Sequence, residues 1–441
     1  MPTRNVIRVS EFEKLYYDDA KLFKQKHWEA LCRYQEQQSK KEDVIEYFRI
    51  LNKGVQFTNY VGVIQAGNLT IEVLPKTDKG STTAANESFE HLDKETAIEK
   101  QKWHDVLLQM LKECRLLQVN HVDYANLNLK SNSILEIYLE LFLNHTEKLL
   151  HEGLIKKYKK SEGNRFALKG QLLFSKNLSL NLVHQERFYV RYSEYNKINI
   201  FNQLLYKTIC LIPQLSTNPW LSDKVNRLLL DFPELPDCRV TAETFSRLVF
   251  DRKTERYKEA LLISKMLLLN YRPDITGGAE NVIAILFDMN ELWEEFVYRR
   301  LKKEEKEYGI TVQRQQSTSF WKTDLLYRSK TIRPDIVIKK ENEVIVLDTK
   351  WKIIEDLIPA DDDLKQMFTY NLFWHCKKSV LLYPAERSRS NEGSFYDFNI
   401  PGQFDTKCSV ETISVLNESH KLDKDLGKKI LTRVLGEAPP A

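Results

Sequence analysis

The sequence predicts a mixed α/β protein, with an N-terminal region of strands and helices followed by a C-terminal mixed sheet flanked by helices. The run 344–347, Val-Ile-Val-Leu, is strongly β-prone and has no polar alternation, which is typical of a strand covered on both faces. Amphipathic helical patterns lie on either side of it, at about 288–308 and 361–375. The order helix, strands, helix, strand predicts helices on both faces of this sheet.

The N-terminal region is expected to span residues 1–275, because the stretch 272–278 is rich in turn-forming residues. Its first part, about 1–80, is β-rich and contains strands at 55–60 and 69–74. The polar stretch that follows, 79–88, is typical of a flexible loop or insert. The C-terminal domain then comprises residues 276–441.

The second part of the N-terminal region, about 96–275, is expected to be mostly helical. A β-like stretch interrupts it at about 165–174, with Gly163 and Asn164 forming a turn. The helices expected in this part lie at about 96–117, 133–151, 196–212 and 252–270.

Composition excludes several classes of protein. No pair among the six cysteines or nine histidines has metal-ligand spacing, so neither a zinc site nor a disulfide framework is indicated. The N-terminus is charged throughout and no apolar stretch reaches membrane-spanning length, so we expect a cytoplasmic protein with no membrane contact. No glycine-lysine phosphate loop is present, so the chain should not hydrolyse nucleotides itself.

The net charge of +4 permits DNA binding through local patches but does not indicate it. The densest basic patch is Lys156, Lys157, Lys159 and Lys160. Its ordinary interpretation is a solvated helix end, and the alternative is a contact with DNA backbone or with a partner.

The residues with chemical potential lie around the covered strand. Asp335 follows a proline, and Asp348 and Lys350 come thirteen and fifteen residues later, directly after the run 344–347. Asp348 and Lys350 lie roughly 6.5–7 Å apart on one side of a strand, whereas Thr349 points to the other side. A turn at 339–342 would set Asp335 beside Asp348. Two carboxylates and an ammonium group then converge, which is the layout of a metal-dependent nuclease of the PD-(D/E)xK type.

Phosphodiester hydrolysis needs this set of groups. Asp335 and Asp348 can hold Mg²⁺, with Mn²⁺ able to replace it, and the metal lowers the pKa of a bound water. Lys350 can orient or deprotonate that water and offset charge on the phosphate. The alternative to a nuclease site is a purely structural one, in which a Pro-Asp turn is followed by a solvated strand end. It stays open because an Asp-x-Lys triplet is common.

Neighbouring helices offer further candidates. Gln366 and Tyr370 are one helical turn apart and share a face, although an amphipathic helix packing on the core would show the same spacing. The preceding helix has a buried stripe, and Glu294 and Glu295 flank that stripe about equally. Periodicity therefore does not decide which of the two glutamates faces the site.

Taken together, these segments resemble the McrC family, the nuclease subunits of McrBC modification-dependent (5-methylcytosine) restriction systems. The resemblance rests on the C-terminal motifs and on N-terminal stretches that include Leu74-Pro75-Lys76, and it covers most of the chain. The family pattern selects Glu294 over Glu295 as an acidic site residue and metal ligand, direct or through water. It makes Gln366 a weaker candidate for orienting Lys350 or the phosphate. One departure is Lys169-Gly170, where Arg-Gly is expected.

The resemblance implies a restriction-endonuclease-like C-terminal fold and a type IV restriction endodeoxyribonuclease subunit that cuts modified double-stranded DNA. It also implies a McrB-like AAA+ GTPase or ATPase partner in the form of a hexameric ring, bound and stimulated through the N-terminal region. Two alternatives remain open. One is a self-sufficient repair or junction-processing nuclease of the same fold, and the other is a non-enzymatic assembly factor.

Overall fold

The computed structural model describes residues 5–19, 21–39, 45–76, 89–114, 116, 133–272, 281–322, 329–341, 343–354, 356–395 and 406–436. The expected insert at 79–88 and most of the turn-rich stretch 272–278 lie outside these residues. No helix in the described part of the chain is both long and apolar enough to cross a membrane. The chain forms two compact units: unit 1 comprises Met1–Ile64, Leu69–Val119 and Leu286–Ala441, and unit 2 comprises Gln65–Asn68 and Asn120–Ile285.

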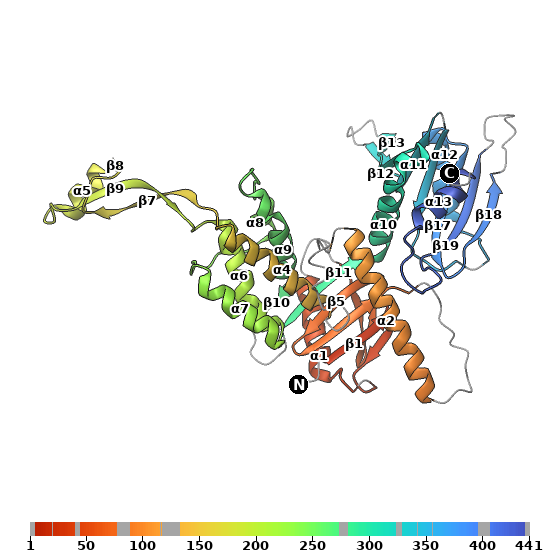
Figure 1. Cartoon of the computed structure of the whole chain (residues 1–441), viewed down its shortest axis with the longest axis horizontal. Helices are drawn as coiled ribbons and strands as arrows, with labels where there is room; N and C mark the ends of the chain where they lie inside the picture. Colours follow the sequence, from red (N-terminus) through yellow and green to blue (C-terminus); the bar gives the residue numbers. More distant parts are fainter. Residues whose placement is uncertain are drawn as a thin grey trace. The chain divides into compact units, whose positions relative to one another are not determined.

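The compact units do not follow chain order, because the segments before residue 65 and after residue 285 belong to the same unit. The domain boundary near 275 predicted from the sequence stays a prediction. What the structure does show is a mixed α/β protein with several sheets, coloured along the chain in Figure 1.

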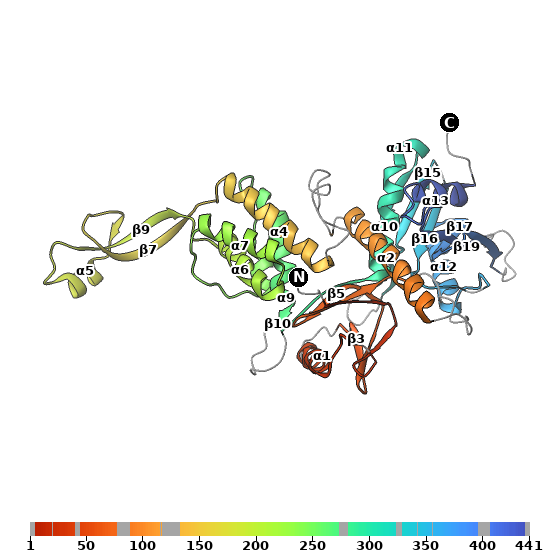
Figure 2. The same ribbon diagram turned by 60° about the horizontal axis from the view of Figure 1, so that its bottom comes forward.

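A five-stranded sheet of order β1-β6-β5-β11-β10, in which β1 and β6 are parallel, contains the N-terminal strands β1 and β6 of unit 1. A smaller antiparallel sheet of order β2-β4-β3 accompanies it. Helix α2 packs on β1 and β6 of the larger sheet and also contacts helix α10 (Figure 2). The elements are β1 (Asn5–Ser10), β2 (Lys14–Tyr16), α1 (Gln25–Gln38), β3 (Phe48–Leu51), β4 (Gly54–Phe57), β5 (Tyr60–Ala66), β6 (Leu69–Leu74), α2 (Phe89–Glu113), α10 (Met289–Lys303), β10 (Tyr271–Arg272) and β11 (Val282–Asp288).

The single strand expected at 55–60 is in fact the end of β4 and the first residue of β5. The break falls at Thr58, whose hydroxyl donates hydrogen bonds to the carbonyls of Glu46 and Tyr47 at 3.0 and 2.8 Å. Asn59 donates its side-chain amide to Asp288 at 3.0 Å. The two polar side chains therefore bind outside the strand ladder, and the pattern of apolar residues does not reveal this.

The C-terminal part of unit 1 contains the expected mixed sheet, with six strands in the order β12-β15-β16-β17-β19-β18. The pairs β16-β17 and β17-β19 are parallel, and the other three pairs are antiparallel. A separate two-stranded antiparallel ribbon, β13-β14, lies in the chain between β12 and β15. The further elements are α11 (Glu305–Tyr308), β12 (Thr311–Arg314), β13 (Thr318–Lys322), β14 (Ser329–Ile332), β15 (Ile336–Lys340), β16 (Glu343–Thr349), α12 (Asp361–Trp374), β17 (Lys378–Ala385), β18 (Arg389–Ser394), β19 (Lys407–Ser414) and α13 (Leu426–Leu435).

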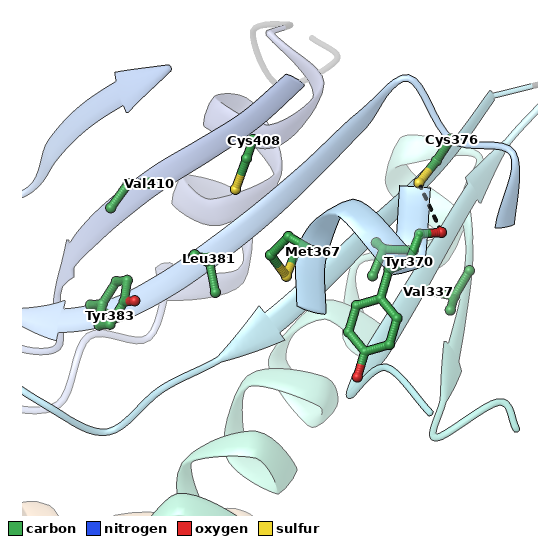
Figure 3. Close-up of a cluster of buried hydrophobic side chains, with 9 residues drawn as sticks. Val337, Met367, Tyr370, Cys376, Leu381, Tyr383, Cys408 and Val410 are labelled. Atoms are coloured by element: carbon green, nitrogen blue, oxygen red, sulfur yellow. Dashed lines mark hydrogen bonds between the residues drawn. The ribbon is translucent and has the colours of Figure 1, made fainter. Parts of the chain in front are cut away.

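Both faces of this sheet are covered, as the unbroken apolar run predicts. On one face Val346 packs in a buried cluster with Met367 and Tyr370 of α12, shown with the neighbouring strands in Figure 3. Ile345 and Leu347 alternate with Val346, so they point to the opposite face, and both are buried. Helix α10 contacts β16 and β12.

Helix α10 buries the expected stripe, and its boundaries differ slightly from the prediction. Asp288 caps its first turn by accepting a hydrogen bond from the Asn290 amide, so Glu291 does not complete a capping box. The helix ends at Lys303, and the remainder of the expected helix is the separate short helix α11, after which Gly309 turns the chain with φ 62°. The buried stripe consists of Leu292, Trp293, Phe296, Val297 and Leu301.

Unit 2 contains a helical group and an antiparallel hairpin. Figure 1 shows β7 and β9 as a two-stranded ribbon with β8 and α5 near its end. Helix α4 begins after its cap residue Ser133, as predicted. Helix α2 of unit 1 begins at Phe89 and ends at Glu113, so it starts and stops a few residues earlier than the predicted helix 96–117. The elements are α4 (Ile134–His151), β7 (Lys157–Arg165), β8 (Gln171–Leu172), α5 (Phe174–Asn181), β9 (Phe188–Asn196), α6 (Ile200–Leu215), α7 (Pro219–Asp231), α8 (Ala242–Ser246), η1 (Glu255–Tyr257) and α9 (Lys258–Asn270).

Two predictions about this hairpin were wrong. The lysines of the basic patch do not end a helix, because α4 stops at His151 and Lys157 already begins β7. Gly163 and Asn164 form no turn, since they pair with Val190 and Tyr189 inside the ladder. Short polar residues are weak strand formers, and here the cross-strand partners of β9 outweigh that preference.

A buried hydrogen bond joins the N-terminal sheet of unit 1 to the C-terminal one. Trp351 donates its indole N–H to Oε1 of Glu11 at 2.9 Å, and the same oxygen accepts the backbone N–H of Lys76 at 3.0 Å. Glu11 is only 4% exposed, and this burial raises the pKa of its carboxyl to about 8. At neutral pH the carboxyl is therefore largely protonated within the folded protein.

The variant Glu11→Gln should be more stable than the native chain at alkaline pH. The folded pKa lies above the unfolded one, so the native stability contribution of Glu11 is complete below about 4.5 and is lost as the pH rises toward 8. Glutamine keeps the neutral shape and loses nothing over this window. We expect a difference of roughly 2 kcal/mol or more at the alkaline end, measured by thermal unfolding across the pH range.

Glu99, an exposed carboxylate of α2, provides the matched control. Glu99→Gln should leave the pH dependence of unfolding unchanged. Parallel stability curves for the native chain and Glu11→Gln would contradict the prediction.

Candidate active site

The β15-β16 hairpin brings the two predicted aspartates together. Its register pairs Ile336 with Leu347, so one step further along the ladder Asp335 lies opposite Asp348. The hairpin closes between Lys340 and Glu343, which are the last pair, and Glu341 in the turn has φ 50°. The expected juxtaposition of the two carboxylates is thus present.

Asp335 is held by a residue that we expected to point away. Its Oδ2 atom accepts the backbone N–H of Thr349 at 2.7 Å and the hydroxyl of the same residue at 2.9 Å. Asp335 precedes β15, so strand alternation does not govern the direction of its side chain, and it can reach across to Thr349. Two hydrogen bonds to one oxygen fix the carboxylate and leave its Oδ1 atom available for other contacts.

Asp348 is almost fully enclosed at the end of β16. It is 1% exposed, and its Oδ2 atom lies 2.8 Å from Nζ of Lys350. Within the described part of the chain, no donor makes a hydrogen bond of good geometry to this buried oxygen. A second carboxylate, Asp363 of α12, lies 3.6 Å from the same ammonium group. Lys350 therefore faces an acidic group on two sides.

A chain of hydrogen bonds orients Lys350. The ammonium donates to Oε1 of Gln366 at 3.2 Å, and Nε2 of Gln366 donates to the hydroxyl of Tyr370 at 2.7 Å. The Tyr370 hydroxyl in turn donates to the carbonyl of Arg333 at 2.9 Å. The shared face of Gln366 and Tyr370 is confirmed, and the chain links α12 back to the segment that carries Asp335.

The structure distinguishes the two glutamates of α10. Oε1 of Glu294 accepts from Nε of Arg314 at 3.1 Å and from Nε2 of Gln315 at 2.9 Å. Glu295 is instead paired with Arg299 and with Arg314. The pKa of Glu294 is raised by burial and then by the nearby charge of Asp335, so Glu294 is the glutamate that faces the aspartates.

The raised pKa values of the two aspartates indicate that a proton or a cation beside these carboxylates is favoured. Burial first, and then the charge of Asp348, raises the pKa of Asp335 to about 6. Burial likewise raises the pKa of Asp348, although Lys350 acts in the opposite direction. For Lys350, burial lowers the pKa, but the surrounding carboxylates outweigh it and the net pKa is raised. Lys350 is therefore a cation in this arrangement, suited to charge stabilisation and to orienting a water.

A family model described as the McrBC 5-methylcytosine restriction system component matches residues 55–384, which is most of the chain. The chain belongs to this family. A comparison with curated protein sequences gave no match.

Solved structures agree with this membership at the level of the fold. A refined half-complex from the tetradecameric assembly of Thermococcus gammatolerans McrB AAA+ hexamers with bound McrC has a TM-score of 0.67 and 19% identity, covering 98% of this chain and 99% of the other. The cryo-EM structure of the Thermococcus gammatolerans McrBC complex has a TM-score of 0.51 and 20% identity, covering 68% and 88% of the two chains. This McrBC component therefore has an McrC-like fold over nearly its full length.

The oxygen donors of this McrBC component suit a Mg²⁺ ion coordinated by two carboxylates better than one coordinated by three. Among the described residues, no three His, Cys, Asp or Glu side chains gather closely enough to hold a metal together. Asp335 and Asp348 nevertheless offer oxygens, and the buried Asp348 Oδ2 has no well-aligned hydrogen-bond donor. Mg²⁺ uses one or two carboxylates and keeps several waters. Glu294, tied to Arg314 and Gln315, can then act through such a water.

Sequence reasoning missed three members of the site: Thr349, Asp363 and Gln315. Thr349 was placed on the far side of the strand, and Asp363 lies in the first turn of α12, where the helix dipole alone accounts for an acidic residue. Gln315 has φ 50°, rare for a residue with a side chain, and its backbone N–H donates to the Asp335 carbonyl at 2.9 Å. No local pattern in the sequence indicates that contact.

In the absence of divalent cations, Asp348→Asn should stabilise the protein. Burial penalises the ionised carboxylate more than Lys350 compensates, since the net pKa is raised. Lys350 keeps Asp363 and Gln366 as partners after the substitution. We expect a gain of roughly 1 kcal/mol at neutral pH, measured by chemical unfolding in chelating buffer.

Lys350→Ala is the matched variant with the opposite sign, because it leaves the aspartates without their cation and should lower stability. If Asp348→Asn were clearly destabilising, or if both variants shifted stability in the same direction, the electrostatic account of the site would be wrong.

Proposed function

We propose that this chain is the endonuclease subunit of an McrBC-type restriction complex, a type IV enzyme that hydrolyses phosphodiester bonds of modified foreign DNA. The observation that carries the proposal is the convergence of Asp335, Asp348 and Lys350 at one end of the mixed sheet, with Lys350 oriented by Gln366. This geometry supports a restriction-endonuclease-like core of the PD-(D/E)xK type. A decayed, non-enzymatic relative would have no reason to retain a buried and a half-buried acid beside a half-buried cation.

Each residue has a distinct part in the proposed hydrolysis. Asp335 and Asp348 would hold Mg²⁺, which when bound lowers the pKa of a coordinated water and neutralises charge on the phosphate. Lys350 places its ammonium beside the scissile phosphate, orients the attacking water and offsets charge as the P–O bond breaks. Gln366 holds the Lys350 side chain in that direction, and Glu294 completes the acidic site through water.

The partner suggested by the solved relatives is an AAA+ ring. The McrC chain of the Thermococcus gammatolerans assembly is bound to McrB AAA+ hexamers. The hairpin of unit 2 offers a surface suited to such docking, because seven large apolar side chains within 166–183 are each more than half exposed: Phe166, Leu168, Phe174, Leu178, Leu180, Leu182 and Val183. Exposed apolar side chains gathered in one segment are typical of protein interaction sites.

The same hairpin contains the one departure from the family pattern. Gly170 cannot be replaced, because its φ is +87° and an added Cβ would lie 2.3 Å from the Arg191 carbonyl oxygen. The preceding Lys169 is exposed. The turn geometry around the expected Arg-Gly pair is therefore kept, and a lysine supplies the positive charge.

Asp335→Ala, Asp348→Ala and Lys350→Ala should each abolish DNA cleavage by the reconstituted complex. Loss of a general acid–base group costs roughly 10²–10⁴ in rate, and loss of a metal ligand at least as much. Plasmid cleavage with the partner, nucleotide and Mg²⁺ measures the effect, with Mn²⁺ expected to replace Mg²⁺ and Ca²⁺ expected not to support turnover.

Lys365→Ala, which removes an exposed lysine of the same helix as Gln366, is the control and should cut normally. Near-native cutting by an Asp348 or Lys350 variant would show that the active site lies elsewhere.

We further predict that the chain alone cuts poorly and depends on a nucleotide-hydrolysing partner bound through the hairpin. Its net charge of +4 provides only a weak sequence-independent affinity for DNA, because most of such affinity comes from neutralising phosphate charges. The double variant Phe174→Ser, Val183→Ser should weaken partner binding and stimulated cleavage by at least about tenfold, measured by pull-down and plasmid assays.

The matched control is Leu230→Ser with Val249→Ser, two equally exposed apolar residues of unit 2 outside the hairpin. Robust cutting by the chain alone would favour the alternative of a self-sufficient nuclease. Equal effects of the two double variants would refute docking through the hairpin.

A further inference from the structure

A groove of about 720 Å³ opens beside the candidate active site. Its volume falls within the range of ligand-binding pockets, roughly 300–1,000 Å³. The walls come from the end of β12, the β13-β14 ribbon and one face of α12, and they include Gln315, Phe320, Arg333, Gln366 and Tyr370. Nothing in the proposed hydrolysis uses the ribbon or this hollow.

The groove is directly connected to the catalytic lysine. Gln366 lines the groove and accepts a hydrogen bond from Lys350 at 3.2 Å. Tyr370 lines it as well and donates to the Arg333 carbonyl. A polymer that places one phosphate at Lys350 can therefore place its adjoining unit in the groove.

The charge of the groove is opposite to that of the neighbouring acidic site. Its lining includes Gln, Ser, Thr, Phe, Ile and Tyr side chains and a single charged residue, Arg333. Arg333 is exposed, and its guanidinium makes no ion pair or hydrogen bond with any residue that the structure describes. An anion is accordingly favoured here, whereas the aspartates nearby repel one.

The ribbon also presents an aromatic ring to the groove. The register of β13 and β14 shifts between Ser319 and Trp321, so Phe320 lies in a β-bulge. Bulges redirect side chains and are common beside active sites. Phe320 is 51% exposed, and its ring packs edge-to-face on Phe373 with centroids 5.7 Å apart, which fixes the ring while leaving surface open to the groove.

We propose that this groove is a subsite for one unpaired nucleotide of the DNA strand next to the scissile phosphate. The base stacks on Phe320, the phosphate pairs with Arg333, and the amide and hydroxyl groups of the walls meet the base edge and sugar. Aromatic stacking combined with a cation is the usual mode of single-strand recognition. The subsite rests on the proposed nuclease function, and it adds that the cut strand is locally opened at the site.

The test measures binding of a short single-stranded oligodeoxynucleotide that carries 2-aminopurine to the full-length protein, without divalent cations. Stacking of the base quenches its fluorescence. Phe320→Ala should weaken binding roughly 5- to 100-fold and abolish the quenching, because stacking contributes about 1–3 kcal/mol per base. Phe320→Trp should retain both, and Arg333→Gln should weaken binding and reduce its salt dependence by about one counterion.

Trp321→Ala is the matched control: Trp321 is the neighbouring exposed aromatic residue of the ribbon, at 55% exposure, and it does not line the groove. Equal effects of Phe320→Ala and Trp321→Ala, or the absence of quenching with the native protein, would overturn the subsite. Its failure is distinguishable from failure of the proposed function: intact cleavage in Phe320→Ala removes only the subsite, whereas quenched binding without any cleavage removes only the nuclease assignment.

Discussion

The enclosure of two carboxylates side by side, with Asp348 buried at the end of β16 and Asp335 half-buried opposite it, is the constraint on which the rest of the C-terminal structure depends. Asp348 is 1% exposed, and the charge of Asp348 raises the pKa of Asp335. Such a pair is tolerated only where cations and donors surround it. Lys350 and Thr349 fill that role here, and Gln366 fixes Lys350 in turn. Under the proposed function, the stability lost by enclosing these acids is what would make them competent to hold a metal.

Contacts around this pair extend to the N-terminal sheet of the same unit. Trp351 immediately follows Lys350, packs on Trp293 with ring centroids 5.4 Å apart, and donates to the buried Glu11. Its backbone N–H also donates to Asn290 of α10 at 3.3 Å. The end of β16 is therefore held by both the N-terminal sheet and the helix that carries Glu294. One residue, Trp351, makes both sets of contacts directly beside Lys350.

Much of the site was predictable because its signals are local. A proline-flanked acid, an unbroken apolar strand and an Asp-x-Lys triplet predict the hairpin, and the hairpin sets Asp335 beside Asp348. The contacts that were missed join residues far apart in the chain or depend on unusual backbone. Thr349 is reached by a side chain outside the strand, and Gln315 adopts a left-handed conformation. In the hairpin of unit 2, ladder partners overrode the turn preference of Gly163, which no local pattern discloses.

The same electrostatics explain why, under the proposed function, DNA affinity and DNA cleavage would come from different surfaces of the chain. A pair of acids repels a DNA backbone until a metal neutralises it, and a net charge of +4 gives the chain little affinity of its own. If the chain is the proposed nuclease, it should therefore cut little when free in solution. Affinity must then come from groups away from the acids, such as an apolar docking surface for a partner and a neutral groove with one arginine. Under the proposed function, cleavage would then depend on assembly, because the acidic site and these two surfaces of the described residues are separate.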